Sequence, residues 1–256
     1  MISVKVAASS LAFVALTSVS TASSQEMAMD VGGQGPVVVF EAGLGEGRES
    51  WKNIVGALGP CLTVVTYDRP GIGESGPPSH PATPILATAV ANELLEQLRE
   101  RRLPPPYLLV GHSLGGLYAQ AFARNHPSVV AGLLLVDASS HLEPPGAFVS
   151  TVPPKPGSIE AAEEAGVAPS VAALLVGPPF PDIPLVVLAA TRHGDTPRRE
   201  ELWRDVQRRT AAMSSKGRID VIDSGHFIQA ERPEAVIDGV LSLAVETGAN
   251  IEACRH

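Results

Sequence analysis

The chain has 256 residues, of which 45% are hydrophobic and 18% charged, and this balance excludes a disordered or fibrous protein. That length is enough for one α/β domain with a substantial core. The formal net charge is −8, so we expect no nucleic-acid partner, because a general nucleic-acid binder needs a basic face.

The first part of the chain differs in composition from the rest. A single lysine precedes an apolar stretch over residues 6–19, and small residues follow it. This layout is typical of a secretory signal peptide, and the stretch is short for a membrane span. We therefore expect a leader over residues 1–24, a mature domain over residues 25–256, and a secreted or periplasmic protein without a membrane span.

Short apolar runs recur along the mature chain with helical patterns between them. The runs are nearly continuous rather than alternating, which is typical of strands buried on both faces of a parallel sheet. Strand–helix alternation predicts a doubly wound, mostly parallel α/β sheet. The predicted strands cover residues 36–43, 62–68, 107–111, 132–137, 184–191 and 218–223, and helical spacing covers 51–58, 90–98, 202–213 and 236–243.

The alternation lapses over about residues 139–182. This stretch is rich in proline and contains two weakly helical pieces, 159–165 and 171–176. A long interruption inside a compact domain is usually functional, so we expect a short lid over the sheet edge. The alternative is a surface excursion without a role in the site.

Ser113 lies within the stretch Gly-His-Ser-Leu-Gly, after the predicted strand 107–111 and before a helical pattern. This strand–turn–helix context is the one that a nucleophile elbow requires. Glycines permit a turn too sharp for larger side chains, and the turn lifts the hydroxyl above the sheet. We therefore expect Ser113 to be a nucleophile, the alternative being an ordinary loop.

A serine hydroxyl needs a general base, which in turn needs an orienting acid. His226 follows the last predicted strand and precedes the last helical pattern. Since parallel sheets hold catalytic groups at the carboxyl ends of their strands, we expect His226 to be the base rather than a helix cap. His112 is expected to be structural, and His193 to shape the site.

Two carboxylates are candidates for the acid, because Asp137 and Asp195 each follow a predicted strand and each lies between the serine and the histidine in the chain. We favour Asp195, with Asp137 as a structural carboxylate at a strand end. An oxyanion formed at the site needs preorganised donors. The backbone N–H groups of Leu114, at a helix start, and Leu44, in a glycine-rich turn, are the candidates, although that turn has the alternative of being purely structural.

The two cysteines, Cys61 and Cys254, lack the spacing of a metal site. Export would allow them to pair, and two free thiols are the alternative. We expect no metal and no cofactor.

Six stretches in this order resemble the α/β-hydrolase superfamily over nearly all of the mature chain. They read FEAGLGEGRESW, TYDRPGIGESG, PYLLVGHSLGGLYAQAFA, LLLVDAS, TRHGD and SGHFIQAERPE. The resemblance implies a triad of Ser113, His226 and Asp195, no cofactor and an inserted lid, with Asp68 and Arg69 as scaffold. Many relatives have His-Gly where this chain has Ala42-Gly43, and this difference keeps the backbone donor.

The function that follows is a carboxylesterase-like serine hydrolase that acts on small, partly apolar ester substrates through an acyl-enzyme. The same triad also serves amide, lactone, thioester or carbon–carbon bonds, and the fold does not separate these reactions. A ligand-binding protein that kept the fold without turnover is a third possibility. The sequence does not indicate an oligomeric state.

Overall fold

A computed structural model describes residues 27–78, 84–147 and 152–254, so the predicted leader over residues 1–24 lies outside the described residues. Strands in this part of the chain form one seven-stranded sheet in the order β1-β3-β2-β4-β5-β6-β7. Neighbouring strands are parallel except β1, which is antiparallel to β3. The strands are β1 (Met29–Gly33), β2 (Val37–Glu41), β3 (Thr63–Tyr67), β4 (Tyr107–His112), β5 (Val130–Val136), β6 (Leu185–Ala190) and β7 (Gly217–Ile222).

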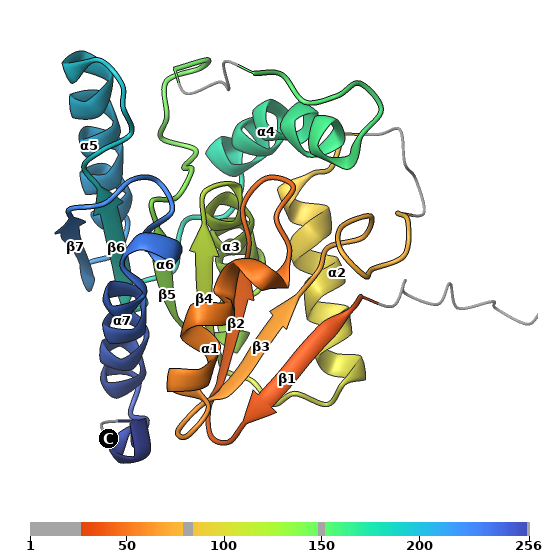
Figure 1. The fold of residues 1–256 in the computed structure, drawn as a ribbon, viewed down its shortest axis with the longest axis vertical. Helices are drawn as coiled ribbons and strands as arrows, with labels where there is room; N and C mark the ends of the chain where they lie inside the picture. The colour runs from red at the N-terminus through yellow and green to blue at the C-terminus, as the bar shows by residue number, and fades with distance from the viewer. Residues whose placement is uncertain (1–26, 79–83, 148–151, 255–256) are drawn as a thin grey trace, which may run out of the picture.

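Helices cover both faces of the sheet, which confirms the predicted α/β class (Figure 1). Helices α1 and α7 pack on one face, and α2, α3 and α5 pack on the other. The α-helices are α1 (Lys52–Leu58), α2 (Ala87–Glu100), α3 (Leu114–Asn125), α4 (Ile159–Val176), α5 (Pro197–Ala211), α6 (Ile228–Glu231) and α7 (Pro233–Glu246). Short 3₁₀ helices are η1 (Arg48–Trp51), η2 (Pro127–Val129) and η3 (Glu252–Cys254). None of the helices in the described residues is long and apolar enough to cross a membrane.

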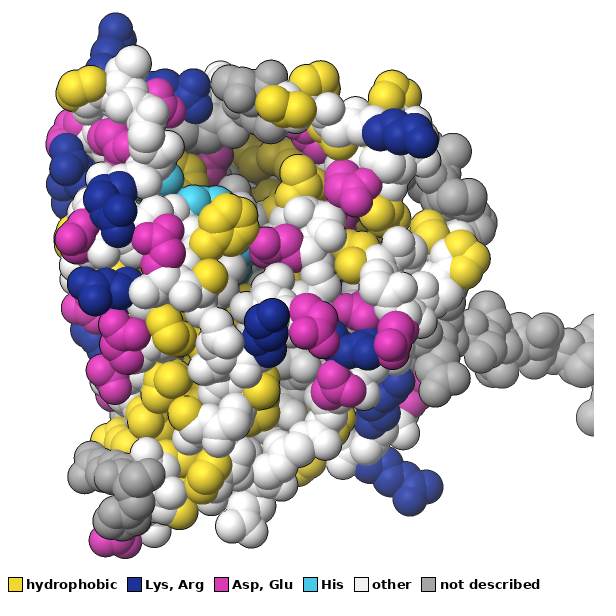
Figure 2. All heavy atoms as spheres, in the orientation of Figure 1, with side chains coloured by type: hydrophobic (Ala, Val, Ile, Leu, Met, Phe, Trp, Pro, Cys, Tyr) yellow, Lys and Arg dark blue, Asp and Glu magenta, His cyan; other side chains and the backbone are white. Residues whose placement is uncertain are grey.

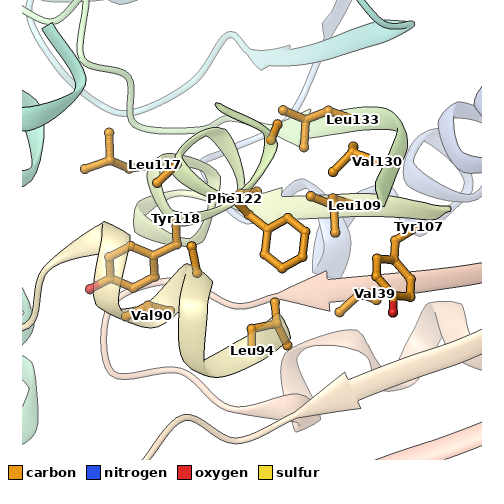
Figure 3. Packing of buried hydrophobic residues seen from close by; sticks show 14 of the residues in the cluster. Val39, Val90, Leu94, Tyr107, Leu109, Leu117, Tyr118, Phe122, Val130 and Leu133 are labelled. Carbon is orange, nitrogen blue, oxygen red and sulfur yellow. The ribbon is translucent and has the colours of Figure 1, made fainter. Parts of the chain in front are cut away.

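The sheet separates two hydrophobic clusters, one on each face. In the first, Phe122 of α3 lies between Leu94 of α2 and Leu109 of β4, and all three are buried (Figure 3). This packing fixes α3 against β4, and the turn between these two elements is where Ser113 lies. The hydrophobic core therefore packs directly beside the turn that carries the predicted nucleophile.

Helix α4 lies within the predicted lid region, above the edge at which the parallel strands end (Figure 1). It is one continuous helix where the sequence indicated two weak pieces. Its middle is tied to α2, because the Ala87 N–H donates to Ser170 Oγ at 2.9 Å. Its last turn is tied to α3, because buried Arg124 donates to the Leu174 carbonyl at 2.8 Å. The helix is thus fastened to the domain by buried polar contacts.

Cys61 and Cys254 form a disulfide with Cα atoms 5.6 Å apart. The bridge joins the segment before β3 to η3 near the C-terminus, and the Cys254 side chain packs on the second hydrophobic cluster. Of the two alternatives that the sequence left open, the paired state is the one observed.

Candidate active site

Ser113 occupies a strained turn between β4 and α3. Its backbone has φ 51° and ψ −123°, a left-handed conformation that an L-residue adopts only where the surroundings enforce it. A Cβ on Gly111 would lie 2.7 Å from the Gly115 carbonyl oxygen, and a Cβ on Gly115 would lie 2.3 Å from the Glu41 carbonyl oxygen. Glycine is therefore required on both sides, as the sequence predicted for an elbow.

His226 meets Ser113 across the edge of the sheet. It lies in the loop between β7 and α6, and its Nε2 is 2.9 Å from Ser113 Oγ. The two residues are 113 positions apart in the chain and meet because β4 and β7 end at the same edge. The predicted nucleophile and base are thus within hydrogen-bond distance of one another.

Asp137, at the end of β5, is the carboxylate that contacts the base. Its Oδ2 lies 2.6 Å from His226 Nδ1, and the side chain is fully buried. The other oxygen accepts from the Ala190 N–H at 3.0 Å and from Trp203 Nε1 at 2.7 Å. Burial acts to raise the pKa of Asp137, but hydrogen bonds from His193 and His226 outweigh it and hold the pKa well below its usual range. The carboxylate is therefore ionised and fixed in place.

The preference for Asp195 over Asp137 is corrected by this geometry. Asp195 accepts from the Thr196 N–H at 2.7 Å and pairs with Arg199 at 2.6 Å, so its carboxylate serves the start of α5. The loop after β6 directs His193, and not Asp195, toward the Asp137 carboxylate. Sequence order alone does not distinguish two strand-end aspartates, and the difference arises from where each loop turns.

His193 also bonds to the carboxylate that orients the base. Its Nε2 lies 2.7 Å from Asp137 Oδ2, and its Nδ1 lies 2.8 Å from Glu200 Oε2. Partial burial acts to lower the pKa of His193, but its bonds to Asp137 and Glu200 prevail and raise the pKa to about 9. An imidazolium at this position bridges two carboxylates. Sequence reasoning expected His193 to shape the site but gave no indication of Glu200 or Trp203.

His112 is buried behind the elbow and does not face the pocket, in accordance with its expected structural role. Its Nε2 lies 3.1 Å from the backbone oxygen of His226, and its Nδ1 lies 3.1 Å from Glu46 Oε2. The contact with His226 restrains the loop that carries the base. His112 therefore connects the turn after β2 with the loop after β7.

The turn after β2 lies beside the elbow, since a Cβ on Gly115 would also be 2.4 Å from the Ala42 carbonyl oxygen. Leu44 lies in this turn, followed by Gly45 with φ +67°. Leu114 is the first residue of α3, where backbone N–H groups have no partner within the helix. Both predicted oxyanion donors thus belong to backbone segments that border Ser113.

A pocket of about 180 Å³ opens at the serine. Figure 2 shows histidine side chains at the margin of a hollow on this face. The loop that carries His226 and the first half of α5 both border this pocket. The lining residues are Ser113, Ser139, His193, Asp195, Arg199, Glu200, Trp203 and His226.

Asp137, His193 and His226 are the described residues whose ligand atoms cluster closely enough to hold a metal ion, within 4.8 Å of one another. In this cluster both imidazoles direct a nitrogen at the same carboxylate oxygen, at 2.7 and 2.6 Å. These are hydrogen-bond distances, so the donor atoms are already engaged with each other. The three side chains therefore form one hydrogen-bonded group that is centred on Asp137 Oδ2.

The model of the α/β hydrolase family matches residues 38–239, and the chain belongs to this family. The uncharacterized protein YqjL of Bacillus subtilis is 35% identical over 106 residues, a match that spans 41% of this chain and 41% of YqjL. The chain therefore aligns with about two fifths of the length of this curated relative. The aligned part is too short to assign the relative's whole activity to this chain.

Solved structures share the fold over most of their length. A thermophilic esterase from Thermogutta terrifontis superposes with a TM-score of 0.72 at 22% identity, covering 90% of this chain and 96% of that one. The epoxide hydrolase CorEH superposes with a TM-score of 0.65 at 18% identity, covering 87% and 98%. At such identities the likeness defines the fold, and together with the family it supports a hydrolytic role.

Proposed function

We propose that the protein is a serine hydrolase that cleaves small ester substrates through Ser113, His226 and Asp137. The observation that carries the proposal is the continuous line of contacts from Ser113 Oγ to His226 Nε2, 2.9 Å, and from His226 Nδ1 to Asp137 Oδ2, 2.6 Å. A hydroxyl, an imidazole and a buried carboxylate in this order are the arrangement that activates a serine for acyl transfer.

In the first half-reaction, His226 Nε2 takes the proton from Ser113 Oγ as this oxygen attacks the carbonyl carbon. The new C–O bond converts the carbonyl oxygen into an oxyanion, which accepts from the Leu44 and Leu114 N–H groups. Asp137 stabilises the imidazolium that forms. When the oxyanion reforms the carbonyl, the C–O bond to the leaving alcohol breaks, and the alcohol oxygen takes the proton from His226.

In the second half-reaction, His226 removes a proton from water, and the resulting nucleophile attacks the acyl carbon. Collapse of this second oxyanion breaks the bond to Ser113 Oγ, which regains the proton from His226. The products are a carboxylic acid and an alcohol. No group besides these side chains, the backbone donors and water enters the balance.

The volume of the pocket, about 180 Å³, favours small substrates. Trp203 supplies an apolar wall for a partly apolar substrate, and Arg199 and Glu200 at the start of α5 add charged groups to the lining. The ester is the preferred bond because an alkoxide is a better leaving group than an amide anion, and because resonance stabilises an ester carbonyl less than an amide carbonyl.

The test compares the wild type with Ser113→Ala on a panel of small aryl esters, lactones and aryl amides, together with labelling by a fluorophosphonate. We expect ester turnover and labelling in the wild type, and neither in the variant. Labelling that persists in Ser113→Ala, or a wild type that turns over none of the esters, would overturn the proposal. Preferential turnover of lactones or amides would reassign the bond and retain the nucleophile.

A further inference from the structure

Arg69 lies buried between the turn after β2 and the start of α4. One guanidinium nitrogen donates to Glu41 at 2.7 Å and to the Ala42 carbonyl at 2.8 Å, and another donates to the Gly43 carbonyl at 2.6 Å. Its Nε donates to Glu163 of α4 at 2.6 Å. The Arg69 side chain therefore donates hydrogen bonds to the backbone of one turn and to two buried carboxylates.

The Gly43 carbonyl belongs to the same peptide unit as the Leu44 N–H. A peptide unit is planar and trans, so a group that fixes its oxygen also fixes the opposite direction of its N–H. Arg69 holds the Gly43 oxygen at 2.6 Å, and the Leu44 N–H must therefore point away from Arg69. A cation on the carbonyl also polarises the peptide, which makes the N–H a stronger donor.

Glu163 holds the other side of the same turn. Its Oε1 accepts from Arg69, and its Oε2 accepts from the Gly45 N–H at 2.8 Å. The first turn of α4 also touches this segment, because a Cβ on Gly45 would lie 2.5 Å from Glu160 Cγ. The peptide that carries Leu44 is thus held on both sides, by Arg69 before it and by Glu163 after it.

We propose that Arg69 and Glu163 are positioning residues that orient and polarise the Leu44 N–H as an oxyanion donor, and that α4 takes part in catalysis by supplying Glu163. This inference rests on the proposed function. Without Glu163, α4 would be a cover over the pocket; with it, the helix becomes part of the support of the site. Arg69 and Glu163 are both buried, and their pairing offsets the cost of burying a charge without a partner.

The test uses Glu163→Gln. Arg69 and the Gly45 N–H donate to different oxygens of Glu163, and glutamine replaces one of these oxygens by an NH2 donor that would face another donor. The matched control is Glu164→Gln, the same chemical change one position further along α4, at a half-buried side chain. Glu163→Asp is the second variant, because it keeps the charge beside Arg69 and draws the carboxylate back from Gly45. It decides the matter if Glu163→Gln does not fold.

Two measurements separate positioning from a general structural role. We expect kcat for a small aryl ester to fall about tenfold in either Glu163 variant with KM nearly unchanged, a fraction of the 10²–10³-fold lost when a whole oxyanion donor is removed. We also expect a matching loss of affinity for a small alkyl trifluoromethyl ketone, which forms an oxyanion on the serine. The pH profile of kcat/KM should keep its midpoint, because His226 and Asp137 are untouched.

A folded Glu163 variant with the kcat and ketone affinity of the Glu164→Gln control would overturn the inference. So would a loss of kcat that affinity for the trifluoromethyl ketone does not follow. Failure of the proposed function has a different signature: either the wild type turns over no ester, or Ser113→Ala retains the turnover, whatever the Glu163 variants do.

Discussion

Asp137 and Asp195 provide a matched pair at the scale of single residues. Asp137→Asn keeps the shape of the side chain but removes the charge that orients and stabilises the His226 imidazolium, so we expect kcat to fall about 10³–10⁴-fold. Asp195→Asn changes a residue that pairs with Arg199 at the rim of the pocket, and we expect an effect below about tenfold, confined mainly to KM. Steady-state kinetics on one aryl ester check both. A crippled Asp195 variant beside an active Asp137 variant would return the acid to the position that the sequence favoured.

We expect His193 to make the free energy of unfolding depend on pH. Its folded-state pKa of about 9 lies above the ordinary value of 6.5, so its contribution to the free energy of unfolding is complete below about pH 6.5 and is lost as the pH rises through 9. Urea unfolding of the wild type and of His193→Gln between pH 5 and 10 tests this. We expect the stability advantage of the wild type to be largest at pH 5–6 and to vanish near pH 10. An advantage that stays constant or grows with pH would show that the imidazolium between Asp137 and Glu200 is not the stabilising species.

The candidate site was predictable from the sequence where local pattern carries the information. Ser113 is flanked by glycines whose absent Cβ atoms the turn demands, and His226 follows a strand that must end at the same edge. The acid was not predictable, because its choice depends on where the loops after β5 and β6 turn, and only the loop after β5 places its aspartate against His226. Glu163 lies 94 positions from Arg69, and nothing local in either stretch indicates that they meet.

Among the strands and helices, those with an apolar pattern of their own were predictable from the sequence, and those held by contacts with distant residues were not. All six strands from β2 to β7 were predicted. Strands β2 to β6 are mostly apolar runs buried within the sheet, whereas β7 lies at the sheet edge and is half-buried or exposed. Strand β1 was not predicted, because its residues Met29–Gly33 are mostly exposed, include two glycines and pair only at the edge of the sheet. Helix α4 was indicated only as two weak pieces, because its ties to the domain come from Ser170 accepting from α2 and from Arg124 of α3.

At the scale of the whole molecule, the catalytic groups lie at the carboxyl ends of the parallel strands and the disulfide lies near their amino ends. The C-terminal end is tied by the Cys61–Cys254 disulfide, which lies near the amino ends of β2 and β3, at the edge of the sheet away from Ser113. A disulfide of this kind is what an oxidising compartment permits, although export itself stays a prediction because residues 1–24 lie outside the described part. Stability and catalysis are therefore expected to separate in this molecule.

That separation is testable with the double variant Cys61→Ser/Cys254→Ser, which removes both thiols and so leaves no unpaired cysteine. The bridge closes a loop with a sequence separation of 193, and its loss frees the unfolded chain, so we expect the free energy of unfolding to fall by about 2–4 kcal/mol. Ester kcat and KM should stay within about twofold at a temperature where the variant is folded, because neither cysteine lines the pocket and the bridge lies at the other end of the strands. Urea unfolding of the wild type with and without reductant is the control, and reduction should reproduce the loss. Unchanged stability in both experiments would mean that packing of α7 and η3 on the second hydrophobic cluster already holds the C-terminal end, and that the disulfide adds nothing to it.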